Sequence, residues 1–221
     1  MRIGINKVQV IISPPKQSEV EKEGGRLMLS TEQDILRLIE ADSWMMEILQ
    51  VVQSLNLPDC WVCAGFVRTK VWDTLHSHNV NTPLADIDVV YFDKSNIKEE
   101  EEKRLENRLK IILPSEPWSV KNQARMHVVN GEKPYESTVD AISRFPETAT
   151  SIAVKLDQHT QLILVTPWGI EDLLSLQIKP TPPFTMKKEL VEIYEARLKQ
   201  KDWKSKWPKV KVYSIYASRE S

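Results

Sequence analysis

The first regular pattern along the chain is helical. Between residues 30 and 57, apolar residues fall three or four positions apart, which predicts one long helix or two helices that break near Asp42 and Ser43. Residues 30–33 read Ser-Thr-Glu-Gln, and a hydroxyl followed three residues later by Gln predicts a capping box at the helix start. The apolar positions of this pattern are Ile35, Leu38, Ile39, Met45, Met46, Leu49, Val52 and Leu55.

The pattern changes repeatedly within residues 60–93. Residues 60–64 read Cys-Trp-Val-Cys-Ala and predict a buried strand, which Gly65 turns into a helix. A loop over residues 76–83 leads to a second predicted strand at residues 85–93, where Val-Val-Tyr-Phe is strongly strand-forming. One side of the helix between the strands is formed by Val67, Val71, Trp72 and Leu75.

The remaining patterns predict further helices and strands. Helices are expected at residues 97–113, 166–176 and 186–201. Residues 118–129, WSVKNQARMHVV, predict a strand or an extended loop, and residues 151–166 predict a β-hairpin. The fold class that follows is α/β, or α+β: a small mixed sheet flanked by helices and extended by the C-terminal hairpin.

The chain divides into three predicted regions. Residues 1–29 are expected to form a flexible arm with one edge strand over residues 8–12. A Glu-Gly-Gly tripeptide shortly before Met28 has codons that fit a bacterial ribosome-binding site, so Met28 is an alternative start. Residues 30–180 form the main domain, and residues 181–221 add a helix and a basic, tryptophan-containing tail packed on the core.

Composition excludes some classes of partner. The 221 residues are 41% hydrophobic and 28% charged, as in an ordinary globular protein. A formal net charge of -1 gives no overall attraction to nucleic acid or to an anionic membrane. No apolar run approaches the roughly 20 residues of a membrane-spanning helix, and the N-terminus lacks a convincing signal-peptide pattern. We therefore expect a cytoplasmic protein with no membrane partner, for which nucleic acid is not the favoured ligand.

Cys60 and Cys63 are the only cysteines, and their C-x-x-C spacing raises the question of a redox or zinc site. No second pair of ligands at suitable spacing accompanies them. Residues three apart on a strand face opposite sides, so the two sulfurs are expected to diverge. We interpret them as reduced, structural side chains.

Asp86 and Asp88 head the second predicted strand of the central stretch. The strand period of two places them on one face, with Cα atoms roughly 6.6 Å apart. Mg²⁺ is commonly held by one or two carboxylates together with substrate phosphates and water. Aspartates at a strand start also cap turns, so the pair alone predicts a metal site only weakly.

The preceding helix strengthens the metal interpretation. A helix that starts at Gly65 and Phe66 leaves backbone N–H groups free to bind a phosphate, and Arg68 lies one turn further on. An anion-binding helix start beside two carboxylates fits phosphoryl or nucleotidyl transfer, which needs positioning and charge neutralisation rather than a covalent nucleophile.

The central stretch resembles the signature of the polymerase-β-like nucleotidyltransferase superfamily, especially the version in CCA-adding enzymes and bacterial poly(A) polymerases: Gly-Gly-x-Val-Arg-Asp, a gap, then Asp-x-Asp. Over residues 30–212 the chain also resembles a bacterial family of nucleotidyltransferase-like proteins of unknown substrate. The resemblance implies a nucleoside triphosphate substrate and Mg²⁺ or Mn²⁺ held by Asp86 and Asp88. The matching segments are residues 64–73, 84–88, 118–127, 145–150 and 169–174.

The chain departs from that signature at several positions. Ala64 and Phe66 flank the single Gly65, and Thr69 stands where the motif has an aspartate. The superfamily normally adds a third carboxylate from another strand. Asp140 is the first choice for that role, although it also fits a helix cap after Ser137 and Thr138. Glu147 and Asp157 are the next choices.

Cationic residues offer two further hypotheses. If residues 118–128 are extended, Lys121, Arg125 and His127 share one face, which is either a triphosphate-binding stripe or a solvated strand face. The basic tail carries Trp203 and Trp207, which either stack on single-stranded nucleic acid or, in our preferred interpretation, anchor the tail to the core. The acidic run at residues 99–102 is interpreted as a solvated helix start.

Together these patterns and the resemblance imply a metal-dependent nucleotidyltransferase that moves a nucleoside monophosphate from a nucleoside triphosphate to an unknown acceptor hydroxyl. Asp86, Asp88 and Asp140 are the expected catalytic acids, and Gly65, Phe66, Arg68, Lys121 and Arg125 the expected phosphate-binding residues. The alternatives are a catalytically inactive module that binds nucleotide or protein, and an RNA-binding accessory protein that uses the basic tail.

Overall fold

The computed structural model describes residues 10–12, 22–23, 26–27 and 29–217. Most of the predicted N-terminal arm, including Met28, lies outside the described residues. Within the predicted edge strand, residues 10–12 form β1 (Val10–Ile12), which pairs antiparallel with β8 (Leu162–Val165) and confirms a strand there. No helix in the described ranges has both the length and the apolar character needed to cross a bilayer.

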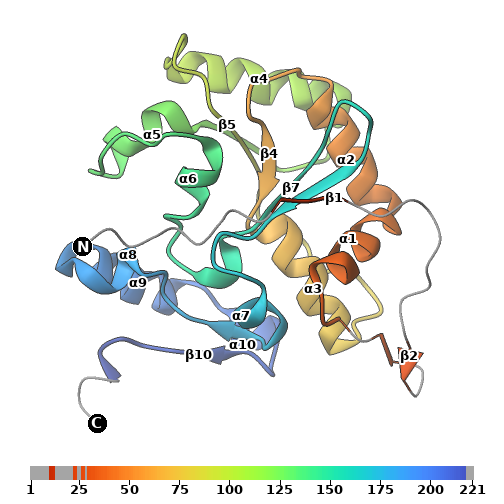
Figure 1. Ribbon diagram of the computed structural model, residues 1–221, viewed down its shortest axis with the longest axis vertical. Helices are drawn as coiled ribbons and strands as arrows, with labels where there is room; N and C mark the ends of the chain where they lie inside the picture. Colours follow the sequence, from red (N-terminus) through yellow and green to blue (C-terminus); the bar gives the residue numbers. More distant parts are fainter. Residues whose placement is uncertain (1–9, 13–21, 24–25, 28, 218–221) are drawn as a thin grey trace.

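One mixed sheet organises the described part of the chain (Figure 1). Its six strands lie in the order β1-β8-β7-β4-β5-β6. The pairing of β5 with β6 is parallel and every other pairing in this sheet is antiparallel. The predicted hairpin is confirmed as β7 and β8, and it extends the sheet beside β4. The remaining strand bounds are β4 Trp61–Cys63, β5 Ile87–Tyr91, β6 Trp118–Asn122 and β7 Ala153–Leu156.

Helices surround this sheet, and two small ladders complete the fold. The predicted break near Asp42 and Ser43 separates α1 from α2, with Asp42 as the N-cap of α2. The helices are α1 Glu32–Glu40, α2 Ser43–Gln53, α3 Gly65–His76, α4 Glu99–Ile112, α5 Gln123–Val129, α6 Thr138–Ile142, the 3₁₀ turn η1 Thr148–Thr150, α7 Glu171–Leu174, α8 Pro183–Met186, α9 Lys188–Gln200 and α10 Trp203–Lys206. The small ladders are β2 Lys22–Glu23 with β3 Arg26–Leu27, and β9 Gln177–Ile178 with β10 Lys211–Val212.

Alternate strand residues divide the core between the two faces of the sheet. Val62, Val89 and Val120 belong to the larger cluster, which also takes apolar residues from α1 to α4. Cys63 and Val90 belong to the smaller cluster, which is closed mainly by α6 and the segment after it. Figure 1 shows α1 and α3 on one side of the sheet and α5 and α6 on the other. Different elements therefore cover the two faces of the sheet, and the cluster on the Cys63 face has fewer buried residues than the other cluster.

Two sequence predictions about local structure are wrong. The capping box of α1 uses Thr31 and Asp34 rather than Ser30 and Gln33, because Asp34 reaches back to the backbone N–H of Thr31 at 2.9 Å. The predicted extended segment 118–129 stops at Asn122, whose side chain accepts a hydrogen bond from Ala124 N and starts α5. Lys121 and His127 therefore do not share a strand face.

Candidate active site

The register between β4 and β5 fixes the two aspartates relative to the start of α3. Cys63 pairs with Asp88 across the antiparallel ladder, and Ser119 pairs with Asp88 on the other side. The chain before Asp86 also reaches the helix start, because Leu84 Cδ2 lies 4.0 Å from the position that a Cβ on Gly65 would take. The structure thus brings Gly65, Asp86 and Asp88 together, as the sequence predicted.

Asp88 lies in an environment that disfavours its negative charge. Burial raises the pKa of Asp88 to about 6, and the neighbouring charge of Asp86 adds to the rise. The Ser119 side chain, Lys201 and Arg68 all act in the opposite direction. Asp86 itself is exposed. A cation between the two carboxylates would remove the repulsion that their proximity creates.

The start of α3 leaves its backbone donors available. Its N-cap is Ala64, which has no side-chain oxygen to accept from the first turn. Ala64 adopts φ 54 and ψ -114, a positive-φ conformation that normally belongs to glycine. The side chain of Phe66 is buried in the core and lies 5.7 Å from the ring of Trp44, so at the helix start only the backbone of Phe66 is left to bind an anion.

Arg68 lies one turn into α3 and points back toward this helix start. A Cβ on Gly65 would lie 3.7 Å from Arg68 Nη2. Burial lowers the pKa of Arg68 to about 10, and the charges of Glu147, Asp86 and Asp88 oppose that effect. Arg68 therefore stays cationic at neutral pH and lies among three acids, and its buried Nε–H has no hydrogen-bond partner among the described residues.

Sequence reasoning missed two cations at the C-terminal end of α9, which act on Arg68 and Asp88. Arg197 donates from Nε to Glu147 Oε1 at 2.7 Å, and its charge acts on Arg68. Lys201 caps the end of α9 and lowers the pKa of Asp88 through its charge. Their separation of four residues in an amphipathic helix was the available signal, because such residues lie on one helix face.

Of the acids predicted to complete the site, Asp140 and Asp157 have their partners elsewhere, whereas Glu147 lies near Arg68. Asp140 accepts from the backbone N–H of Glu136 at 3.0 Å and pairs with Arg144 at 3.2 Å in the first turn of α6. Asp157 accepts two backbone hydrogen bonds in the turn between β7 and β8. Glu147 is fully buried and bound by Arg197. Within the described residues, no group of three or more His, Cys, Asp or Glu side chains is placed to hold a metal ion.

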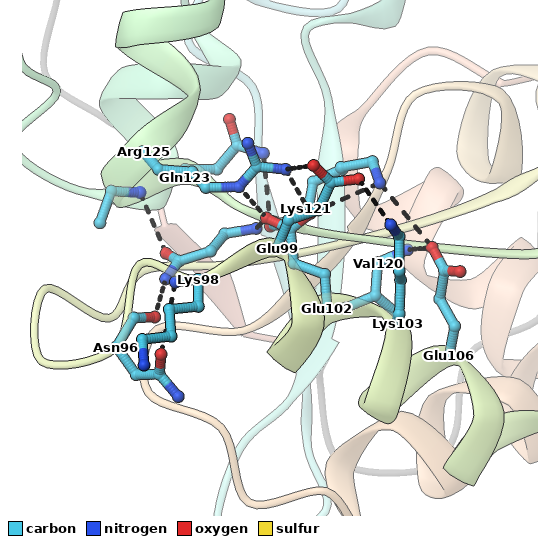
Figure 2. Close-up of polar contacts among 12 residues, drawn as sticks. Asn96, Lys98, Glu99, Glu102, Lys103, Glu106, Val120, Lys121, Gln123 and Arg125 are labelled. Carbon is cyan, nitrogen blue, oxygen red and sulfur yellow. Dashed lines mark hydrogen bonds and ion pairs between the residues drawn. The ribbon is translucent and has the colours of Figure 1, made fainter.

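Lys121 and Arg125 instead form an ion-pair network around Glu102 (Figure 2). Arg125 makes a bidentate contact with Glu102, with both N···O distances 2.7 Å, and Lys121 Nζ lies 3.5 Å from the same carboxylate. Asn122 N also donates to Glu102 at 2.8 Å. Glu102 is fully buried, so the prediction that the whole acidic run is solvated is wrong for this residue.

The two cysteines are free thiols in surroundings that favour their protonated form. Cys63 is buried on the sheet face that also carries Asp88, and burial raises its pKa well above the usual value. Burial likewise raises the pKa of Cys60 to about 12. Both thiols are free and protonated at neutral pH, as the structural interpretation requires.

Comparison with known proteins decides the family. A model for a family described as nucleotidyltransferase matches residues 50–212, which is more than half of the chain and includes Gly65, Arg68, Asp86 and Asp88. The chain belongs to this nucleotidyltransferase family.

Solved structures support the same fold for this nucleotidyltransferase. It is similar to a protein described by its NMR structure as revealing a CCA-adding enzyme head domain: the sequences are 34% identical, the TM-score is 0.75, and the match covers 84% of this chain and 97% of that one. It is also similar in fold to the Thermotoga maritima CCA-adding enzyme solved with tRNA_CCA, at 15% identity, TM-score 0.50, and coverage of 83% of this chain and 43% of that enzyme. The chain thus spans less than half of that enzyme's length. A search among curated proteins finds no match.

The two acids of this nucleotidyltransferase are suited to a divalent ion whose remaining ligands come from substrate and water rather than from the protein. Asp86 and Asp88 supply two carboxylates, and burial together with the charge of Asp86 raises the pKa of Asp88 to about 6. Mg²⁺ accepts such a pair when phosphates and water fill the remaining positions. The donor set therefore fits an ion that is completed by a phosphorylated substrate.

Proposed function

We propose that this protein transfers a nucleoside monophosphate from a nucleoside triphosphate to an acceptor hydroxyl, releases pyrophosphate, and requires Mg²⁺ or Mn²⁺. The observation that carries the proposal is the β4–β5 pairing, which sets the acid pair beside the uncapped start of α3. Membership of a nucleotidyltransferase family supports it independently.

Each group of the site has a role in this proposal. Asp86 and Asp88 hold the divalent ion, which when bound neutralises charge on the phosphates. The N–H groups of Gly65 and Phe66 and the guanidinium of Arg68 bind phosphate oxygens. The acceptor oxygen bonds to the α-phosphorus while the bond from that phosphorus to the bridging oxygen of the β-phosphate breaks. The hydroxyl proton passes to solvent, and pyrophosphate takes the electron pair of the broken bond.

The direct test uses each labelled nucleoside triphosphate in turn, with Mg²⁺ or Mn²⁺ and a cell extract as the source of acceptor. We expect the wild-type protein to transfer label to one class of molecule. Asp86→Asn combined with Asp88→Asn should reduce transfer by at least about 100-fold while leaving the circular dichroism spectrum unchanged. Asp93→Asn is the matched control, because Asp93 lies just beyond the other end of β5, where it accepts from Ser95. Full activity in the double variant would refute the proposal.

A second candidate function is a catalytically inactive module that binds nucleotide. The observation that favours it is the lack, among described residues, of a third acid grouped with Asp86 and Asp88. It predicts that Mn²⁺ and a nucleoside triphosphate bind to the wild-type protein and not to the double variant, whereas no label is transferred. The same two proteins thus separate the two functions.

An RNA-binding role for the basic tail has less support. Trp203 is 4% exposed and Trp207 2% exposed, and Tyr194 is fully buried. These rings are therefore inside the core and do not offer faces on which bases stack. The burial of these rings supports the preferred interpretation of the tail as a segment anchored to the core.

A further inference from the structure

Trp207 packs the C-terminal tail against α3, the helix whose first residues belong to the candidate site. It follows α10, and its backbone N–H closes that short helix on Trp203 O at 2.7 Å. Its ring meets Trp72 edge-on, with centroids 5.2 Å apart and planes at 75°. The next turn continues the attachment, since Lys209 N donates to His76 Nε2 at 3.1 Å. The tail therefore packs along the C-terminal half of α3.

Asp73 connects this tail to the loop that ends at Asp86. Asp73 is buried, with 4% of the residue exposed, and its Oδ1 accepts from Trp207 Nε1 at 2.7 Å. The same carboxylate accepts from the hydroxyl and the backbone N–H of Thr82, both at 2.7 Å. Thr82 lies four residues before Asp86. The buried carboxylate of Asp73 thus connects the C-terminal tail to the loop that precedes Asp86.

Arg68 receives the second contact from the tail. Its guanidinium carbon lies 5.3 Å from the ring centroid of Trp72 and 5.7 Å from that of Trp207. Both distances are within the range of a cation–π contact. Trp72 is fixed by its own hydrogen bond from Nε1 to Leu173 O at 2.9 Å. Arg68 is therefore held by two indole rings, one of which comes from the tail.

We propose that Trp207 and Asp73 are positioning residues of the nucleotidyl-transfer site, through which the C-terminal tail sets the place of both Arg68 and the loop before Asp86. The inference rests on the proposed function, because it assigns Arg68 to phosphate and Asp86 to the metal ion. Neither positioning residue touches the reacting atoms. Their effect is transmitted by the two contacts of one indole: its N–H to Asp73 and its ring to Arg68.

The test measures binding of Mn²⁺ with ATP, CTP, GTP or UTP to the full-length protein by electron paramagnetic resonance. Trp207→Phe keeps a ring beside Arg68 and removes the donor to Asp73, whereas Trp207→Leu removes both contacts. For the nucleotide that the wild type binds best, we expect Trp207→Phe to weaken binding between about twofold and thirtyfold, and Trp207→Leu to weaken it further. Near-ultraviolet circular dichroism, recorded below the unfolding temperature, verifies that each variant is folded.

Trp203→Phe is the matched control, because Trp203 is also buried in the same tail and, within the described part of the chain, neither hydrogen-bonds to Asp73 nor makes a cation–π contact with Arg68. Binding by this variant should stay within twofold of wild type, about the smallest effect expected of a coupled residue. Equal binding by wild type and Trp207→Phe, or an equal loss in Trp203→Phe, would overturn the positioning role alone. Failure of the wild type to bind Mn²⁺ with any of the four nucleotides would overturn the proposed function, and the positioning role with it.

Discussion

At the scale of single residues, the site contains two residues in energetically unfavourable environments, Asp88 and Ala64. Asp88 is a carboxyl whose charge is opposed by burial and by Asp86. Ala64 is a residue with a side chain at a backbone conformation suited to glycine. Such local costs persist where the surrounding structure holds them, and they cluster at functional sites. Both fit a site that is completed by ligands.

The first residue-scale prediction concerns Asp88 in the metal-free protein. Its folded pKa of about 6 exceeds its ordinary value of 3.8, so stability decreases as pH rises through this window, because the folded state must release a proton that it binds more tightly. Asp88→Asn removes this effect and should raise the free energy of unfolding at about pH 8 by on the order of 2 kcal/mol. Urea unfolding in EDTA measures it.

The same comparison at about pH 4 supplies the internal control, because wild-type Asp88 is then protonated in the folded state and the gain should nearly vanish. Asp93→Asn should show no comparable gain at high pH. A gain of equal size at both pH values would assign the effect of Asp88→Asn to packing rather than to charge.

The second residue-scale prediction concerns Ala64. Replacing it with glycine relieves the strain of φ 54 and should stabilise the protein by about 1 kcal/mol, net of the entropy that glycine adds to the unfolded chain. Thermal unfolding measures the change. Ala149→Gly is the comparison, because Ala149 is buried in η1 without a positive φ and should lose stability. Loss of stability in Ala64→Gly would show that the methyl group contributes more than the strain costs.

At the scale of elements, α3 contributes both the proposed phosphate-binding residues and the attachment point of the C-terminal tail. Its start faces the acid pair, while its C-terminal half holds Asp73 and the attachment of the tail. The helix leaves β4 directly and returns through one loop to β5, so a 31-residue segment, 61–91, holds the acids and the phosphate-binding helix start. This contiguity is why both were visible as a local sequence pattern.

The element-scale prediction separates stability from binding at Gly65. A Cβ there would lie 3.7 Å from Arg68 Nη2 and 4.0 Å from Leu84 Cδ2, which are ordinary contact distances. Gly65→Ala should therefore leave the unfolding temperature unchanged or slightly higher, since alanine favours helix. It should nevertheless weaken nucleoside triphosphate binding about tenfold, because the added methyl group obstructs the approach of a phosphate to the helix start. Calorimetric titration with Mn²⁺ and nucleotide measures the affinity, and unchanged affinity would remove Gly65 from the phosphate site.

At the scale of the whole molecule, the sequence predicted what depends on neighbouring residues and missed what depends on distant ones. The helix α4 was predicted from its apolar residues, but the burial of Glu102 was not. Its spacing of three and seven residues from Leu105 and Leu109, which places it on the buried face, was the available signal. The cationic partners of Glu102 are Lys121 of β6 and Arg125 of α5. Because Glu102 is distant from them in the sequence, both cations were predicted to be available for phosphate.

The link between Trp207 and Asp73 lies further beyond sequence reasoning, because 134 residues separate the two partners. Burial of Trp207 was expected from its type, but no periodicity predicts which polar group its N–H meets. For the same reason the sequence could not decide among the candidates for a third acid, and the first choice, Asp140, pairs with Arg144 in the structure. The strand order places β7 beside β4 although the paired residues Cys63 and Ala153 are 90 positions apart in the chain.

The pairing of β1 with β8 has a consequence for solubility. Residues 162–165 read Leu-Ile-Leu-Val, and β1 satisfies the outer hydrogen-bonding side of this strand. A chain shortened to Met28 would lack that cover and turn β8 into an unprotected edge, the kind of surface on which a second molecule adds its own strand. We therefore expect the short N-terminal strand to limit self-association through β8, which is separated from β5 in the sheet by β7 and β4.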